Sequence, residues 1–157
     1  MPRKDPPPDP EFNLENFLPY LLNQAAERTS EEFHEHYRAE YDLTRTQWRV
    51  VANLGRFGSM AAAEICRISH IEKTAVSRAV SVLEGRGLLS RSRDAADKRQ
   101  ESLTLTPAGT EVFRTLGKRA IDYDDRLRNR LGPHLSSQLE AMLRQLILAA
   151  GHGDGDA

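Results

Sequence analysis

Between residues 44 and 106 the spacing of apolar positions changes from a helical to an alternating pattern. In residues 72–85 apolar side chains recur at intervals of three and four positions, which is typical of an amphipathic helix. A shorter apolar segment at residues 61–68 precedes it, and a break at Ser69 and His70 separates the two. Two short helices joined in this way predict a helix-turn-helix.

After the second helix, apolar residues alternate with polar ones, as they do in a strand with one buried face. Two such stretches, residues 88–93 and 101–105, flank a polar segment at residues 94–97. They predict an antiparallel hairpin whose turn lies at residues 94–97. Gly85 and Gly87 are expected to end the preceding helix, because glycine readily takes the positive φ of a helix C-terminus. A helix-turn-helix followed by such a hairpin is a winged helix.

The second helix has a polar and cationic face opposite its apolar stripe. This face consists of Lys73, Thr74, Ser77, Arg78 and Ser81. The hairpin adds the cations Arg91, Arg93, Lys98 and Arg99. Hydroxyl and cationic side chains donate hydrogen bonds to phosphate oxygens and base edges. We therefore predict that the helix enters the major groove of double-stranded DNA and that the hairpin reaches the minor groove.

Further helical segments with apolar stripes lie on both sides of the winged helix. One covers residues 13–41, and residues 107–150 form two more, separated at Gly132 and Pro133. A winged helix alone needs none of these stripes, so we predict that they join two copies of the chain in a homodimer. The predicted interface residues are Leu14, Phe17, Leu18, Leu21, Phe113, Leu116, Leu127, Leu131, Leu139, Met142 and Leu146.

Length and composition agree with one mostly helical domain. The 157 residues are 39% apolar and 29% charged, as in an ordinary globular protein. We expect one domain at residues 13–150, a disordered arm at residues 1–12 and a flexible tail at residues 151–157. The net charge of -1 hides a basic segment, since residues 67–99 carry eight basic and four acidic side chains. Such a local basic patch is expected where a surface meets phosphates.

Several classes of protein are disfavoured by what the sequence lacks. There is one cysteine, Cys66, so an intramolecular disulfide is excluded, and the apolar runs fall short of the about 18 residues of a membrane span. Residues 1–11 lack the apolar core of a signal peptide, so we expect a cytoplasmic protein. We found no phosphate-binding loop or nucleophile motif, and we therefore expect neither an enzyme nor a bound cofactor or metal.

Four stretches that occur in a fixed order resemble those of a known protein family. They are EICRISHIEKTAVSR, LEGRGLLSR, the triplet Asp97-Lys98-Arg99 and LTLTPAG. In this combination the chain resembles the MarR family of bacterial transcriptional regulators, over most of residues 13–150. The resemblance implies that Arg99 enters the minor groove and that Asp97 orients it. It also implies pairing through the N- and C-terminal helices, which would place two recognition helices about 34 Å apart on a pseudo-palindromic operator.

The resemblance further implies a response to a small effector. MarR-like proteins usually release DNA when a small compound, often aromatic and anionic, enters the cleft between the DNA-binding lobe and the dimer helices. The candidate residues for this cleft are His34, Tyr37, Arg38 and Trp48. The turn departs from the family pattern, since His70 stands where glycine is common and Glu72 stands where a better helix cap is usual. Ser69 with Glu72 could form a capping box one register earlier.

These observations favour a ligand-responsive repressor that binds DNA as a homodimer. One alternative is a redox-sensing regulator that uses Cys66, although a buried structural thiol fits the same position. Another is a winged helix that binds proteins and has no specific affinity for DNA. Salt-dependent binding of duplex DNA distinguishes this last alternative from a regulator.

Overall fold

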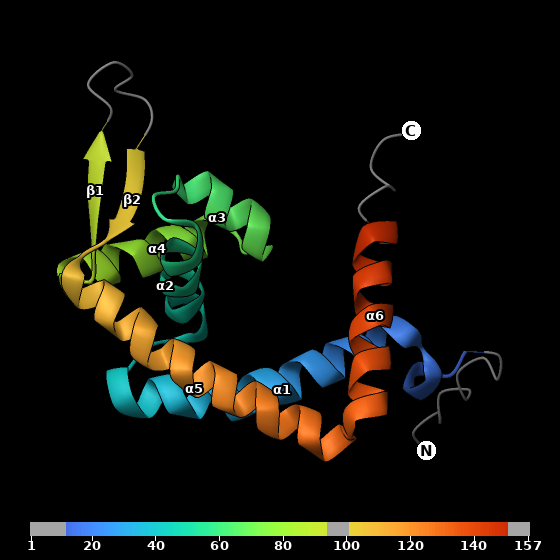
Figure 1. Ribbon diagram of the computed structural model, residues 1–157. Helices are drawn as coiled ribbons and strands as arrows, with labels where there is room; N and C mark the ends of the chain where they lie inside the picture. The colour runs from blue at the N-terminus through green and yellow to red at the C-terminus, as the bar shows by residue number, and fades with distance from the viewer. Residues whose placement is uncertain (1–11, 94–100, 151–157) are drawn as a thin grey trace, which may run out of the picture.

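The computed structural model describes residues 12–93 and 101–150. It is mainly helical with one two-stranded antiparallel sheet, as predicted. The elements are η1 (Leu14–Asn16), α1 (Leu18–Tyr41), α2 (Arg45–Phe57), α3 (Ala62–Ser69), α4 (Lys73–Gly85), β1 (Leu89–Arg93), β2 (Glu101–Leu105), α5 (Pro107–Leu131) and α6 (Pro133–Ala150). Figure 1 shows α2, α3, α4 and the hairpin gathered in one lobe, while α1, α5 and α6 extend away from it.

Side chains at the helix starts explain where α2 and α5 begin. The Thr44 hydroxyl accepts a hydrogen bond from the Gln47 amide at 3.2 Å, and the Gln47 side chain accepts one from the Thr44 amide at 3.0 Å. This reciprocal pair is a capping box, which pairs two of the amides that a helix start leaves without helical partners. Thr106 caps α5 by accepting from the Gly109 amide at 3.1 Å, and Pro107 occupies the first helical position.

The turn between α3 and α4 uses a left-handed residue where the sequence places no glycine. His70 has a φ of 51° and ends α3. The predicted capping box of Ser69 with Glu72 is wrong, because Ser69 is still part of α3 and its hydroxyl accepts from the Asn53 side chain at 2.8 Å. Glu72 is the N-cap of α4 but makes no side-chain capping hydrogen bond. α4 therefore starts at Lys73.

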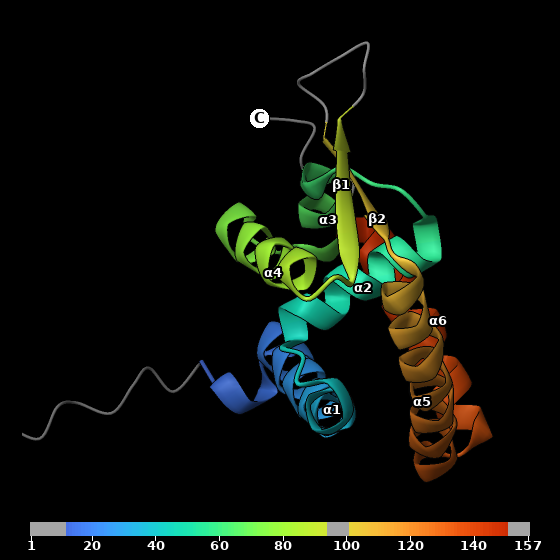
Figure 2. The same cartoon turned by 90° about the vertical axis from the view of Figure 1, so that its left-hand side faces the viewer.

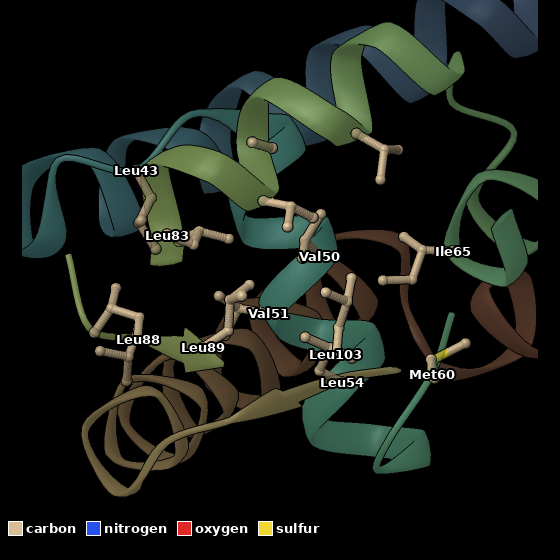
Figure 3. Packing of buried hydrophobic residues seen from close by; sticks show 14 of the residues in the cluster. Leu43, Val50, Val51, Leu54, Met60, Ile65, Leu83, Leu88, Leu89 and Leu103 are labelled. Atoms are coloured by element: carbon tan, nitrogen blue, oxygen red, sulfur yellow. The ribbon is translucent and has the colours of Figure 1, made fainter. Parts of the chain in front are cut away.

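The core of the lobe lies between α2, α3, α4 and the hairpin (Figure 3). It includes the whole predicted stripe of α4, formed by Val76, Ala79, Val80 and Leu83. Val50, Val51 and Leu54 of α2 pack against it, together with Ile65 of α3 and Leu103 of β2. Burial of this stripe fixes which face of α4 remains available to a partner.

The first half of α5 belongs to the same core, which corrects part of the predicted dimer interface. Leu116 is 0% exposed within its own chain, so the prediction that it meets a second copy is wrong. Phe113 is partly buried against the same core and lies over Gly55 of α2. The stripe of α5 is continuous, but α2 covers its N-terminal part. A regular spacing of apolar residues does not reveal where one covering surface ends and another begins.

The remaining predicted interface residues lie away from this core. Most of them are exposed in the single chain: Leu14, Phe17, Leu18, Leu21, Leu131, Leu139, Met142 and Leu146. Leu127 is half-buried and lines an apolar groove of about 310 Å³ between α5 and α6. Figure 1 shows α6 turned sharply from α5 and standing apart from the lobe. Within Pro133–Ala150, Ser136 is the one buried residue.

Gly109 allows α5 to start directly against the hairpin. A Cβ atom at this position would overlap the backbone carbonyl oxygen of Leu88, which accepts a hydrogen bond from the Thr106 amide at 3.1 Å. We expect Gly109→Ala to lower the free energy of unfolding by about 1–3 kcal/mol, the usual cost of overpacking. Chemical denaturation measures this loss. Gly117→Ala is the matched control, because open space surrounds Gly117 in the same helix and alanine favours a helix. Equal stability of the two variants would contradict the proposed overlap.

Candidate nucleic-acid interface

The polar face of α4 lies on the surface of the lobe. Its side chains, Lys73, Thr74, Ser77, Arg78 and Ser81, are all exposed. The apolar stripe on the other side of the helix is buried, so burial alone orients this face outward. Figure 2 shows α4 projecting from the lobe beside the hairpin. The 13 residues of α4 make a rod about 20 Å long. An α-helix is about 10–12 Å across with its side chains, which fits the roughly 12 Å width of a major groove.

The C-terminal end of α4 is tied to the end of α1. The Arg86 guanidinium donates to the Tyr41 carbonyl at 2.6 Å and to the Asp42 carbonyl at 3.4 Å. These carbonyls lie at the C-terminus of α1, where the helix leaves acceptors without helical partners. A cation is also favoured there by the helix dipole. Arg86 therefore links the helix of the candidate interface to a helix outside the lobe.

The hairpin is held to the lobe on the β2 side by backbone pairing. Met60, between α2 and α3, exchanges two backbone hydrogen bonds with Leu103, at 3.0 Å and 2.8 Å. The hydroxyl groups of Ser59 and Ser102 are in contact, and Thr104 donates to Ser59 at 3.1 Å. The strands themselves pair in a register that places Arg93 opposite Glu101. This wing therefore has a fixed base.

Two of the predicted wing cations already have partners in the chain. Arg91 donates from Nε to Glu84 at 2.9 Å and from Nη1 to Glu101 at 3.3 Å. Arg93 donates from Nε and Nη2 to the other oxygen of Glu101, both at 3.2 Å. The hydrogen bond from Arg91, followed by that from Arg93, lowers the pKa of Glu101. The other predicted wing residues, Asp97, Lys98 and Arg99, lie outside the described residues.

Three of the four predicted effector residues, His34, Tyr37 and Trp48, form an aromatic cluster. Tyr37 is 1% exposed and stacks on Trp48 with ring centroids 6.0 Å apart, and His34 lies 5.0 Å from the Tyr37 ring. Burial raises the pKa of the Tyr37 hydroxyl. Arg38 is exposed on α1. Phe33, which the sequence analysis missed, packs against both Tyr37 and Trp48. Its aromatic character and the spacing of four from Tyr37 could have revealed it.

A cavity of about 590 Å³ lies beside this cluster, between α1 and α5. It is lined by Glu32, His36, Tyr123, Arg126, Asn129 and Arg130. Arg130 donates to Glu32 at 2.7 Å, and this hydrogen bond lowers the pKa of the Glu32 carboxyl. The sequence analysis missed these residues, because it considered cleft residues on α1 and α2 alone. The basic positions 126 and 130, one helical turn apart on α5, were the available signal.

The described residues offer few other kinds of site. Cys66 is half-buried on α3 and packs against the core. Among residues 12–93 and 101–150, no group of three side chains is arranged to hold a metal ion. None of the helices that the structure describes is both long and apolar enough to cross a membrane.

Comparison with known proteins agrees with this geometry. A model described as MarR family matches residues 41–100. The solved structure of the transcriptional repressor CouR, bound to a 23-mer DNA duplex, is 31% identical and has a TM-score of 0.75; the match covers 85% of this chain and 94% of that one. The MarR family regulator SPO1453 from Silicibacter pomeroyi DSS-3 is 28% identical, with a TM-score of 0.79 and coverage of 89% and 99%. The regulator HosA of Escherichia coli O127:H6 is 26% identical, and the match covers 81% of this chain and 94% of HosA.

A helix-turn-helix with a two-stranded wing, framed by long helices from both ends of the chain, defines the winged helix-turn-helix class of DNA-binding proteins. The chain belongs to the MarR family of DNA-binding transcriptional regulators. Proteins of this family regulate transcription and are not enzymes.

Proposed function

We propose that this protein is a ligand-responsive repressor that binds a pseudo-palindromic operator as a homodimer. The observation that carries the proposal is the exposed face of α4, where three hydroxyls and two cations stand opposite a fully buried stripe. Such a face suits base edges and phosphates together. CouR, the relative at 31% identity, is a repressor solved on a DNA duplex, which supports the same role here.

The side chains of α4 have different proposed roles according to their position. Ser77 and Arg78 lie in the middle of the helix, where they would approach base edges in the major groove. Lys73 begins the helix and would meet a phosphate, as would Thr74. On the wing, Arg93 is 69% exposed and would add a phosphate contact, while Arg99, oriented by Asp97, would enter the minor groove.

The homodimer is supported by exposed apolar surface on elements outside the lobe. Leu14 and Phe17, near η1, are 48% and 45% exposed, and Met142 of α6 is 62% exposed. Large apolar side chains left exposed on the terminal elements are expected where a second copy covers them. The groove between α5 and α6 offers a place where such side chains from a second copy could pack. Pairing would set two recognition helices on successive turns of DNA.

Effector binding is proposed for the region between α1 and α5. The cavity there, about 590 Å³, has the size of a typical small-molecule pocket. Arg126 and His36 line it with donors for an anion, and Tyr123 supplies an aromatic surface. Phe33 connects this cavity to the aromatic cluster, because its ring lies 5.5 Å from that of Tyr123, which lines the cavity, and 5.9 Å from that of Trp48 on α2. A small aromatic anion therefore matches the chemistry of the cavity.

Titration with duplex DNA at several salt concentrations tests the proposed function. We expect Arg78→Ala to lose about 1–3 kcal/mol of discrimination between a duplex selected from a random library and a scrambled one. Lys73→Ala should weaken binding to both duplexes and reduce the salt slope by about one. Lys118→Ala, which removes an exposed cation of α5, is the control and should bind as the wild type does.

The same titration separates the regulator from a winged helix that binds proteins alone. A wild-type protein without salt-dependent affinity for duplex DNA would defeat the proposed function. If Arg78→Ala and Lys73→Ala lost affinity equally for both duplexes, residues outside the middle of α4 would have to recognise the bases.

A further inference from the structure

We propose that Arg91 is a positioning residue that fixes the wing against the recognition helix, and that it does not contact phosphate. We call Glu84, Arg91 and Glu101 the wing brace. Glu84 belongs to the last turn of α4, while Arg91 and Glu101 belong to the two strands of the wing. The inference rests on the proposed DNA-binding function and assigns to one of its basic residues a different role.

Each of the three nitrogens of the Arg91 guanidinium already has a partner within the chain. Its Nε donates to Glu84 at 2.9 Å, its Nη1 to Glu101 at 3.3 Å, and its Nη2 lies 3.5 Å from the hydroxyl of Ser81. The side chain is 32% exposed, compared with 69% for Arg93. Arg91 therefore offers a phosphate two remaining N–H donors on a side chain that is mostly covered, whereas Arg93 stands largely in solvent.

Charge balance supports the same assignment. Hydrogen bonding to Glu84 raises the pKa of Arg91, and hydrogen bonding to Arg91 lowers the pKa of Glu101, so the pairs are charged at neutral pH. The two arginines of β1 are balanced by the two carboxylates of Glu84 and Glu101. Arg91 lies between both carboxylates, so its charge is compensated where it stands, whereas the more exposed Arg93 meets one carboxylate alone. The ion pairs of Arg91 act within the protein.

On its β1 side the wing needs a side-chain contact that holds it to the lobe. β2 is held to the lobe by its backbone pairing with Met60, but β1 exposes every side chain after Leu89. Among the described residues of that exposed part, Arg91 is the one with a bond to α4. Because α4 and the wing would bind different grooves, the angle between them decides whether both can bind at once. Arg91 sets this angle.

The direction in which one substitution changes DNA affinity tests the wing brace. Removing a carboxylate beside bound DNA normally raises affinity, since it removes repulsion from phosphates. If Glu84 holds the wing through Arg91, Glu84→Gln should instead lower affinity for the selected duplex by about two- to fivefold, the range for an exposed charge pair. Glu72→Gln, at the N-cap of the same helix, is the matched control, because the Glu72 side chain makes no capping hydrogen bond. Its affinity should stay equal or rise.

The salt slope gives a second and independent result. Arg91→Gln should lower affinity while leaving the salt slope unchanged, whereas loss of a phosphate contact at Lys73 reduces the slope by about one. An increase in affinity for Glu84→Gln would overturn the brace. A reduction of the slope by about one for Arg91→Gln would also overturn it, because it would show a phosphate contact.

Hydrogen exchange separates failure of the brace from failure of the proposed function. Amides of residues 89–93 should exchange faster in Glu84→Gln than in the wild type, without any DNA present. Unchanged exchange would overturn the brace even in a protein that binds DNA. If exchange were faster in Glu84→Gln but the wild type had no affinity for duplex DNA, Arg91 would still hold the wing to α4. Its role in DNA binding would then be wrong.

Discussion

Leu116→Ala is expected to lower the free energy of unfolding by about 2–5 kcal/mol, the range for truncating a buried leucine. Leu116 is fully enclosed by its own chain, and Val112, one turn earlier on α5, is 5% exposed. The substitution therefore opens a cavity inside the lobe, and the surrounding helices can fill it only in part. Chemical denaturation measures the loss.

The position of Leu116 makes this prediction specific. Its truncation should destabilise the lobe that carries the recognition helix, and DNA binding should fall because less protein is folded. Lys118→Ala, two residues further along the same helix and exposed, is the control and should stay within about 0.5 kcal/mol of the wild type. If Leu116→Ala kept wild-type stability but no longer dimerised, Leu116 would belong to the dimer interface and its assignment to the core would be wrong.

The sequence predicted the winged helix well because each of its parts is encoded locally. The stripe of Val76 to Leu83 determines the buried face of α4, and the exposed face follows from it. Thr44 and Thr106 cap α2 and α5 through residues three positions away. Interactions over such short distances in the chain depend little on the rest of the fold, so a periodic pattern and a capping residue are sufficient to predict them.

Features that depend on distant residues were not predictable in the same way. Leu116 is buried because α2 lies over that part of α5, and its place in a regular stripe cannot show this. Ser69 accepts from Asn53, 16 positions earlier, and so does not cap α4. The sequence predicts Arg91 as a cation that faces DNA, whereas the fold brings Glu84 and Glu101 beside it. In each case the deciding partner lies on another element.

The same distinction applies to the candidate effector residues. The sequence predicts that Tyr37 and His34 face a cleft, but Tyr37 is buried and stacks on Trp48. The open cavity lies instead against α5, where Arg126 and Tyr123 face α1. Which side of α1 is covered depends on how α2 and α5 approach it. The residue types of α1 alone do not determine that.

Leu146→Asp is expected to separate the proposed dimer without unfolding the lobe. Leu146 is 41% exposed on α6, and the single buried residue of Pro133–Ala150 is Ser136, so the lobe core does not depend on this helix. In a two-fold interface the substitution would bury two unpaired carboxylates, at a cost on the order of 3–5 kcal/mol each. We expect an interface of roughly 2,000 Å² to dissociate at that cost. Sedimentation should show a folded monomer, and specific DNA binding should be lost because one recognition helix then reads one half-site.

Ala141→Asp, which adds the same charge on the opposite side of α6, is the control and should remain a dimer. If the wild type itself sedimented as a stable monomer at micromolar concentration, the terminal helices would have another role.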